Sequence, residues 1–211
     1  IGNGQVIHAS GTKVGVVQTP IGNSGWTHWL KIPYITYYDS DVTEAPNEQH
    51  IWDVLYAKIG NPYGVAGLMG NLYAESGLQP NNLQNSYEET LGYSDSSYTQ
   101  AVDSGSYTNF TFDSAGYGLA QWTVEDRKTP LLAFANARGC SIADLDMQLA
   151  FLCDELETKF PGVLSALKNA KSVREASDYV LFNLEAPLDQ SEAVQAQRAA
   201  NGSVYYSRYG Q

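Results

Sequence analysis

Residues 65–85 read VAGLMGNLYAESGLQPNNLQN, and this stretch decides the fold. Its apolar residues recur at the spacing of one face of an α-helix. They are Val65, Leu68, Met69 and Leu72. The Ser-Gly pair after Glu75 is a typical helix stop, and a loop of amide side chains follows. The stretch therefore predicts an apolar helix that ends at a single carboxylate.

A second row of small residues runs along the same predicted helix. Gly67, Gly70 and Ala74 share a face at helical spacing. Small side chains let another backbone approach closely. We therefore expect a neighbouring element to pack against this row.

Helical punctuation continues through the rest of the chain. Gly60 marks a helix end, Pro161 a helix start, and Ser172-x-x-Glu175 a capping box. Further helices are predicted at 125–138, around the leucine stripe that begins at Leu145, and at 190–208. The fold class is therefore mainly α.

Two regions depart from this helical pattern. Residues 79–123 are weakly periodic and predict a long loop with one or two short helices around 87–104. Residues 1–38 alternate apolar and polar residues, are rich in Val, Ile, Thr and Tyr, and predict strands. We expect a linker at 39–45 and a helical domain at 46–211.

The overall composition excludes several classes of protein. Hydrophobic residues at 43% and charged residues at 17% are typical of a globular chain. A formal charge of −11 with only 12 Lys and Arg argues against nucleic-acid binding. No apolar run is long enough for a membrane span. Because the chain begins at Ile1 without Met, we expect it to be part of a longer protein.

Aromatic and sulfur-containing residues give weaker signals. The 15 Tyr and 4 Trp fit sugar recognition, and they fit core packing equally well. Cys140 and Cys153 have neither metal nor redox spacing. We expect a loop thiol and a buried helix residue, respectively, and a disulfide between them is the alternative.

Glu75 is the candidate for chemistry. It follows Leu68 and Leu72 on one helix face, so its carboxylate points toward the core or toward a cleft edge. Apolar neighbours and the negative end of the helix dipole would both raise its pKa. A carboxyl group protonated at neutral pH can act as a general acid on a glycosidic oxygen. The alternative is a structural Glu that caps a backbone or pairs with an Arg.

The wider sequence resembles a known family. MGNLYAESGLQP (69–80) and DSAGYGLAQWT (113–123) are similar to segments of phage tail-type lysozymes, within the lysozyme-like and lytic transglycosylase superfamily. LEAP (184–187) and RAANGSVYYSRY (198–209) extend the resemblance, which covers residues 46–209. It implies a lysozyme-like helical domain.

The resemblance also implies roles for individual residues. It makes Glu75 the catalytic acid, and it makes Gln121 a hydrogen-bonding partner of an acetamido group. Tyr73, Tyr117 and Trp122 are the further candidates for substrate contact. Trp122 would stack on a sugar, although a core position is the stronger interpretation because its segment leads directly into a helix.

A second carboxylate is harder to identify. Asp113 opens the segment that matches the substrate cleft, and Glu88 and Glu89 are weaker candidates. Asp113 could equally cap a loop or a helix. Lytic transglycosylases use a single Glu and form anhydro-sugar ends, so both hydrolysis and intramolecular transfer stay open. Neither reaction needs a metal ion or another cofactor.

The first residues carry a separate resemblance. IGNGQVIHASGTKVGVV (1–17) is similar to the last strands of an NlpC/P60 cell-wall peptidase domain. His8 matches the residue that orients the catalytic His in that family. The catalytic Cys and the first His would lie before Ile1, so we expect no peptidase activity from this chain.

Together the two resemblances imply one substrate. They indicate a bifunctional peptidoglycan lysin of a phage tail, prophage or conjugative element, cleaving the β-1,4 bond between N-acetylmuramic acid and N-acetylglucosamine. The implied location is extracellular, at the cell wall or on a virion, with other tail or secretion components as further partners. An inactive wall-binding module is the alternative from another class.

Overall fold

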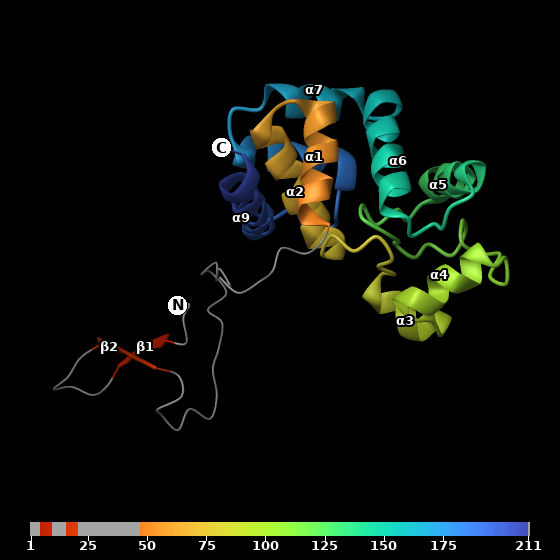
Figure 1. Cartoon of the computed structure of the whole chain (residues 1–211), viewed down its shortest axis with the longest axis horizontal. Helices are drawn as coiled ribbons and strands as arrows, with labels where there is room; N and C mark the ends of the chain where they lie inside the picture. Colours follow the sequence, from red (N-terminus) through yellow and green to blue (C-terminus); the bar gives the residue numbers. More distant parts are fainter. Residues whose placement is uncertain (1–4, 10–15, 21–46, 211) are drawn as a thin grey trace. The chain divides into compact units, whose positions relative to one another are not determined.

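The computed structural model describes residues 5–9, 16–20 and 47–210 (Figure 1). The chain divides into two compact units, Ile1–Pro46 and Asn47–Gln211. We describe each unit by itself. The linker expected at 39–45 lies outside the described residues.

The first unit contains a two-stranded antiparallel hairpin. Strand β1 spans Gln5–Ala9 and strand β2 spans Val16–Pro20. His8 on β1 pairs with Val17 on β2. Extended structure is therefore present where the alternating sequence predicted it, within the described part of residues 1–38.

The second unit is mainly helical, which confirms the predicted fold class. Its α-helices are α1 (Glu48–Ile59), α2 (Pro62–Ser76), α3 (Asn85–Leu91), α4 (Asp95–Asp103), α5 (Glu125–Arg138), α6 (Leu145–Thr158), α7 (Pro161–Asn169), α8 (Val173–Val180) and α9 (Glu192–Tyr209). A π-helical turn, η2 (Leu181–Glu185), follows α8. In Figure 1, α1, α2, α7 and α9 gather at one end of this unit, and α3, α4 and α5 lie at the other.

Helix α2 is the centre of the first of these groups. Every residue from 64 to 72 is buried, and the helix contacts α1, α7, α8 and α9. An added Cβ at Gly67 would lie 2.5 Å from Ala176 Cβ, and one at Gly70 would lie 2.4 Å from the Arg198 carbonyl oxygen. The small-residue row predicted close packing, and this is confirmed at both glycines. Ala74, the third member, is exposed instead.

The predicted helix boundaries are largely confirmed. Gly60 and Gly77 end α1 and α2 in the left-handed conformation that glycine tolerates. Pro161 is the first residue of α7, and the Ser172 side chain accepts from the Glu175 amide. In a full capping box the Glu175 side chain would accept from the Ser172 amide, but here it accepts from the Lys171 amide.

Residues 79–123 form short helices and structured loops, as their weak periodicity predicted. Isolated antiparallel bridges join Leu83 to Tyr117 and Tyr117 to Trp122. The Gln148 side chain also ties this region to α6, because it donates to the Pro80 carbonyl and accepts from the Leu119 amide. The loop segments that carry the candidate site are therefore held against the helical core.

Both cysteines lie where the sequence indicated. Cys140 is a partly exposed thiol after α5, Cys153 is buried in α6, and neither forms a disulfide. Among the helices that the structure describes, none has the length and apolarity needed to cross a membrane.

Candidate functional site

Glu75 lies in the last turn of α2, at the edge of the buried core. Its side chain is 19% exposed, whereas Leu72 in the preceding turn is fully buried. The neighbouring Ser76 hydroxyl donates to the carbonyl oxygens of Leu72 and Leu119. The helix then stops at left-handed Gly77. Local sequence and a contact to the loop after α4 therefore fix where the carboxylate stands.

An arginine from the last helix contacts this carboxylate. Arg198 Nη2 on α9 lies 2.5 Å from Glu75 Oε1, and Arg198 Nη1 donates to Asn71 Oδ1 over 3.2 Å. Asn71 in turn donates to the carbonyl and hydroxyl oxygens of Ser177. The pairing of Glu75 with an Arg was one of the alternatives that the sequence left open. Helices α2, α8 and α9 thus fix the position of Glu75 through one polar network.

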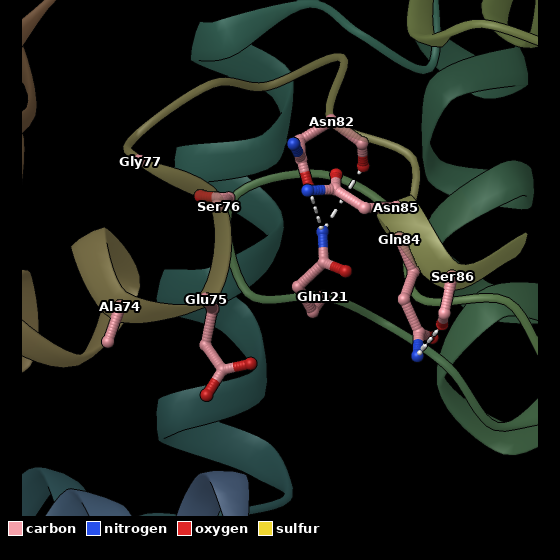
Figure 2. A pocket seen from close by; sticks show the side chains of 9 residues that line it. All are labelled: Ala74, Glu75, Ser76, Gly77, Asn82, Gln84, Asn85, Ser86 and Gln121. Carbon is pink, nitrogen blue, oxygen red and sulfur yellow. Dashed lines mark hydrogen bonds between the residues drawn. The ribbon is translucent and has the colours of Figure 1, made fainter. Parts of the chain in front are cut away.

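A polar hollow opens beside Glu75 (Figure 2). Its volume is about 440 Å³. The residues that line it are Ala74, Glu75, Ser76, Gly77, Asn82, Gln84, Asn85, Ser86 and Gln121. Amide and hydroxyl groups dominate this lining, and Glu75 is the one carboxylate among these nine residues. Such a surface offers many hydrogen-bond donors and acceptors to a polar ligand.

The far wall of the hollow is an amide network between two loops. Gln121 Nε2 donates to the side-chain and backbone oxygens of Asn82, as the dashed lines in Figure 2 show, and to the Gly118 carbonyl. Gln84 Oε1 accepts from the Gly116 amide. Gln121 also has φ +42, a left-handed conformation that is unfavourable for a side chain other than glycine. This network fixes which way the Gln121 carboxamide faces.

Asp113 lies in a buried cluster and does not line the hollow. Its carboxylate accepts from Lys128 Nζ over 2.5 Å, from the Tyr107 hydroxyl over 3.0 Å, from the Tyr98 hydroxyl and from the Ala115 amide. The side chains of Asp113 and Lys128 are 1% and 0% exposed. Burial raises the pKa of Tyr107 to about 12, and Asp113 adds to this effect. These surroundings favour a structural role for Asp113 over its predicted role as second carboxylate.

The other predicted site residues divide into buried and exposed ones. Tyr117 and Trp122 are fully buried; the Tyr117 hydroxyl bonds to Thr99, and the Trp122 indole donates to Glu155 over 2.6 Å. Their positions favour core roles over the sugar contacts expected from the resemblance. Tyr73 is 47% exposed, and its ring packs against that of Tyr205 with the two ring planes at 63°. Glu88 and Glu89 lie on α3 and are not part of the hollow lining.

Sequence reasoning missed two charged residues near Glu75. Arg198 contacts it directly, and Glu185, the last residue of η2, interacts with it electrostatically. Both residues belong to segments of the family resemblance, LEAP and RAANGSVYYSRY, yet neither was singled out. For Glu185, the sequence does contain one signal: a carboxylate within the largely apolar segment LFNLEAP (181–187).

Comparison with known proteins bears on this site. No curated protein matches the chain. Residues 46–209 match a family model described as phage tail lysozyme, and this range includes the hollow, Glu75, Arg198 and Glu185. The chain therefore belongs to the phage tail lysozyme family.

Proposed function

We propose that residues 46–209 cleave the glycan strand of peptidoglycan at the β-1,4 bond between N-acetylmuramic acid and N-acetylglucosamine. The carrying observation is the position of Glu75, partly buried at the end of a core helix and open to a polar hollow. Family membership supports a lysozyme-like activity. A sugar polymer suits this hollow because its hydroxyl and acetamido groups match the amide-rich lining.

Glu75 acts as the general acid in this proposal. Its carboxyl proton moves to the glycosidic oxygen while the carbon–oxygen bond breaks, and the bonding electrons remain with the leaving sugar. Gln121 positions the substrate through its carboxamide oxygen, because its nitrogen already donates to Asn82 and Gly118. Asn85 and Ser86 offer further hydrogen bonds to sugar hydroxyls from the same wall.

Two outcomes of this cleavage are compatible with a single carboxylate in the hollow lining. Water can attack the sugar, which leaves reducing ends, or the muramic acid hydroxyl can attack, which leaves 1,6-anhydro ends. Mass spectrometry of the released fragments separates these reactions directly. Both begin with the same proton transfer from Glu75.

A catalytically inactive wall-binding module is the second candidate. The ion pair between Glu75 and Arg198 favours it, because a contacting cation stabilises the ionised carboxylate. The hollow and its amides would then bind glycan without cutting it. Wall binding by the unchanged chain, with no cleavage at any pH, is the signature of this alternative.

We further propose that the first unit ends a peptidase-like domain of a bifunctional lysin. The antiparallel β1–β2 hairpin, with His8 on β1, supports β-structure in the segment that resembles NlpC/P60 domains. The domain division proposed is 1–38, a linker at 39–45, and 46–211. The whole protein would act at the cell wall, as part of a phage tail or a secretion assembly.

Turbidity clearing of purified Gram-positive walls tests the catalytic proposal. We expect clearing by the unchanged chain and a loss of at least about 100-fold in rate for Glu75→Gln, the range typical of a lost general acid. Glu157→Gln is the matched control, because Glu157 is exposed and pairs with Lys58 away from the hollow. Equal clearing by the Glu75 variant and the unchanged chain would overturn the assignment.

A further inference from the structure

The turn that carries Glu185 has an unusual backbone. Glu185 is the last residue of the π-helical turn η2, and Ala186 follows it with φ +43. A π-turn is rare, and a left-handed alanine is unfavourable by about 1–2 kcal/mol. Such features persist where surrounding structure or function requires them. Here both features lie next to one carboxyl group, that of Glu185.

That carboxyl group is buried without a hydrogen-bond partner. The residue as a whole is partly exposed, but Glu185 Oε1 is inaccessible and no described group bonds to it. An ionised oxygen in such a place would lose its hydration without compensation. The geometry therefore favours a neutral, protonated carboxyl.

Four charged groups from four helices interact electrostatically with Glu185. They are Glu75 on α2, Arg127 on α5, Glu155 on α6 and Arg198 on α9. Arg127 is already engaged by Glu155 through two hydrogen bonds of 2.9 and 2.8 Å, and Arg198 by Glu75. Glu185 is thus a third carboxyl beside two cations that each have a carboxylate partner.

Burial raises the pKa of Glu185 to about 8, and the negative charge of Glu75 adds to the shift. Arg127 and Arg198 act in the opposite direction, with a smaller effect than burial. The two glutamates repel each other when both are ionised, so an ionised Glu75 makes the loss of the Glu185 proton more costly.

We propose that Glu185 is the second carboxyl of this site, a positioning residue that keeps one proton on the Glu75–Glu185 pair at neutral pH. The inference rests on the proposed function, since it assigns a role toward the same Glu75. The sequence suggests Asp113 as the second carboxyl, whereas this proposal assigns that role to Glu185 on η2.

The pair explains how Glu75 can be an acid although Arg198 contacts it. A sugar that covers the exposed side of Glu75 removes its water and favours the proton there. Glu185 then becomes the anion that faces Arg127 and Arg198. Glu75 gives the proton to the glycosidic oxygen, and the pair regains one from solvent after the products leave.

The pH dependence of wall cleavage tests this role. Burial raises the pKa of Glu185 to about 8, so we expect the activity of the unchanged chain to fall as Glu185 loses its proton. Glu185→Gln removes this protonated carboxyl from beside Glu75, so the alkaline limb should move to lower pH. Glu157→Gln should keep the original profile. Superimposed profiles for Glu185→Gln and the unchanged chain would overturn the proposal.

An infrared titration tests the same proton without activity. At pH 7 the unchanged chain should show the carbonyl band of a protonated carboxyl that Glu185→Gln lacks and Glu157→Gln retains. In Glu75→Gln, which removes the like charge, this band should disappear at a lower pH than in the unchanged chain. An absent band would overturn the proposal. The same midpoint pH for the band in Glu75→Gln and in the unchanged chain would also overturn it.

The two readouts separate the possible failures. A chain that never cleaves wall material contradicts the proposed function, whereas the infrared band still decides the state of Glu185. Glu185→Gln resembles the protonated residue in shape and charge, so we expect it to fold. Circular dichroism of each variant checks this directly.

Discussion

Glu75 lies at a helix C-terminus with its side chain 19% exposed, and Arg198 Nη2 lies 2.5 Å from its carboxylate. Arg198 is itself oriented by Asn71, so the cation has little freedom to leave. The chemistry of this residue therefore depends on the balance between the arginine and the nearby Glu185.

Arg198→Lys should weaken the folded state. Lysine keeps the charge but cannot reach both Asn71 and Glu75 with a planar fork. We expect a loss of about 1.5–3 kcal/mol in the free energy of unfolding, the range for hydrogen bonds to charged groups. Urea unfolding measures it. Arg208→Lys is the control, because the Arg208 side chain is 31% exposed against 10% for Arg198, and we expect a smaller loss there. Equal losses would contradict this account.

At this scale the sequence predicts the position of Glu75 at a helix end better than the charged groups around it. Glu75 could be found because helical spacing and a Ser-Gly stop are local signals. Arg198 lies 127 positions from Asn71, and only the tertiary fold brings them together. Asp113 opens the segment that resembles the substrate cleft, but no local pattern indicates the buried Lys128 that engages it.

At the scale of elements, α2 is defined by what packs against it. Gly67 and Gly70 let α8 and α9 approach its backbone, and this approach brings Arg198 to Glu75. The glycines are thus linked to the site through helix packing. A change at these positions should disturb both stability and the position of the arginine.

Gly70→Ala should be strongly destabilising. The new Cβ would meet backbone atoms of Arg198 and Gly202 at 2.4 and 2.5 Å, and backbone cannot move aside easily. We expect a loss of at least about 1–3 kcal/mol, the usual range for overpacking. Thermal and urea unfolding provide the measurement.

Gly162→Ala is the matched control for this change. Gly162 is also helical, but an added Cβ meets nothing closer than the Tyr179 hydroxyl at 3.7 Å. Alanine has the higher helix propensity, so we expect a gain of about 0.5–1 kcal/mol. If both alanine variants behave alike, close packing of α2 against α9 is not what the glycines provide.

Helix boundaries were predictable because caps are local, and the π-turn was not. Gly60, Pro161 and Ser172 each act within one turn of their own helix. The turn η2 continues the apolar face of α8, so periodicity alone predicts an ordinary helix there. The wider π-helical turn accompanies the burial of the Glu185 carboxyl oxygen. That burial depends on tertiary packing, so local sequence patterns do not reveal it.

In the helical unit as a whole, the acidic groups around the site outnumber the basic ones. Two arginines face three carboxyl groups in this cluster, so one carboxyl has no cation of its own. The least costly way to bury the third carboxyl is to keep it protonated. Stability should therefore depend on pH through Glu185.

The sign of this dependence follows from the raised pKa. The folded chain holds the Glu185 proton up to about pH 8, whereas an unfolded glutamate releases it near 4.5. Between these values the folded state binds more protons, so this contribution to stability falls as pH rises. We expect the unfolding free energy of the unchanged chain to decline relative to Glu185→Gln from about pH 4.5 to 8. A constant difference across this range would contradict the assignment.

The central claim is that Glu75 gives the proton that cleaves the glycan. The most direct measurement is the rate at which purified peptidoglycan releases soluble glycan fragments, quantified by mass spectrometry, with the unchanged chain and with Glu75→Gln. We predict fragments ending in reducing or anhydro-muramic acid from the unchanged chain, and release at least about 100-fold slower from the variant. Equal release rates from the two proteins would contradict the account.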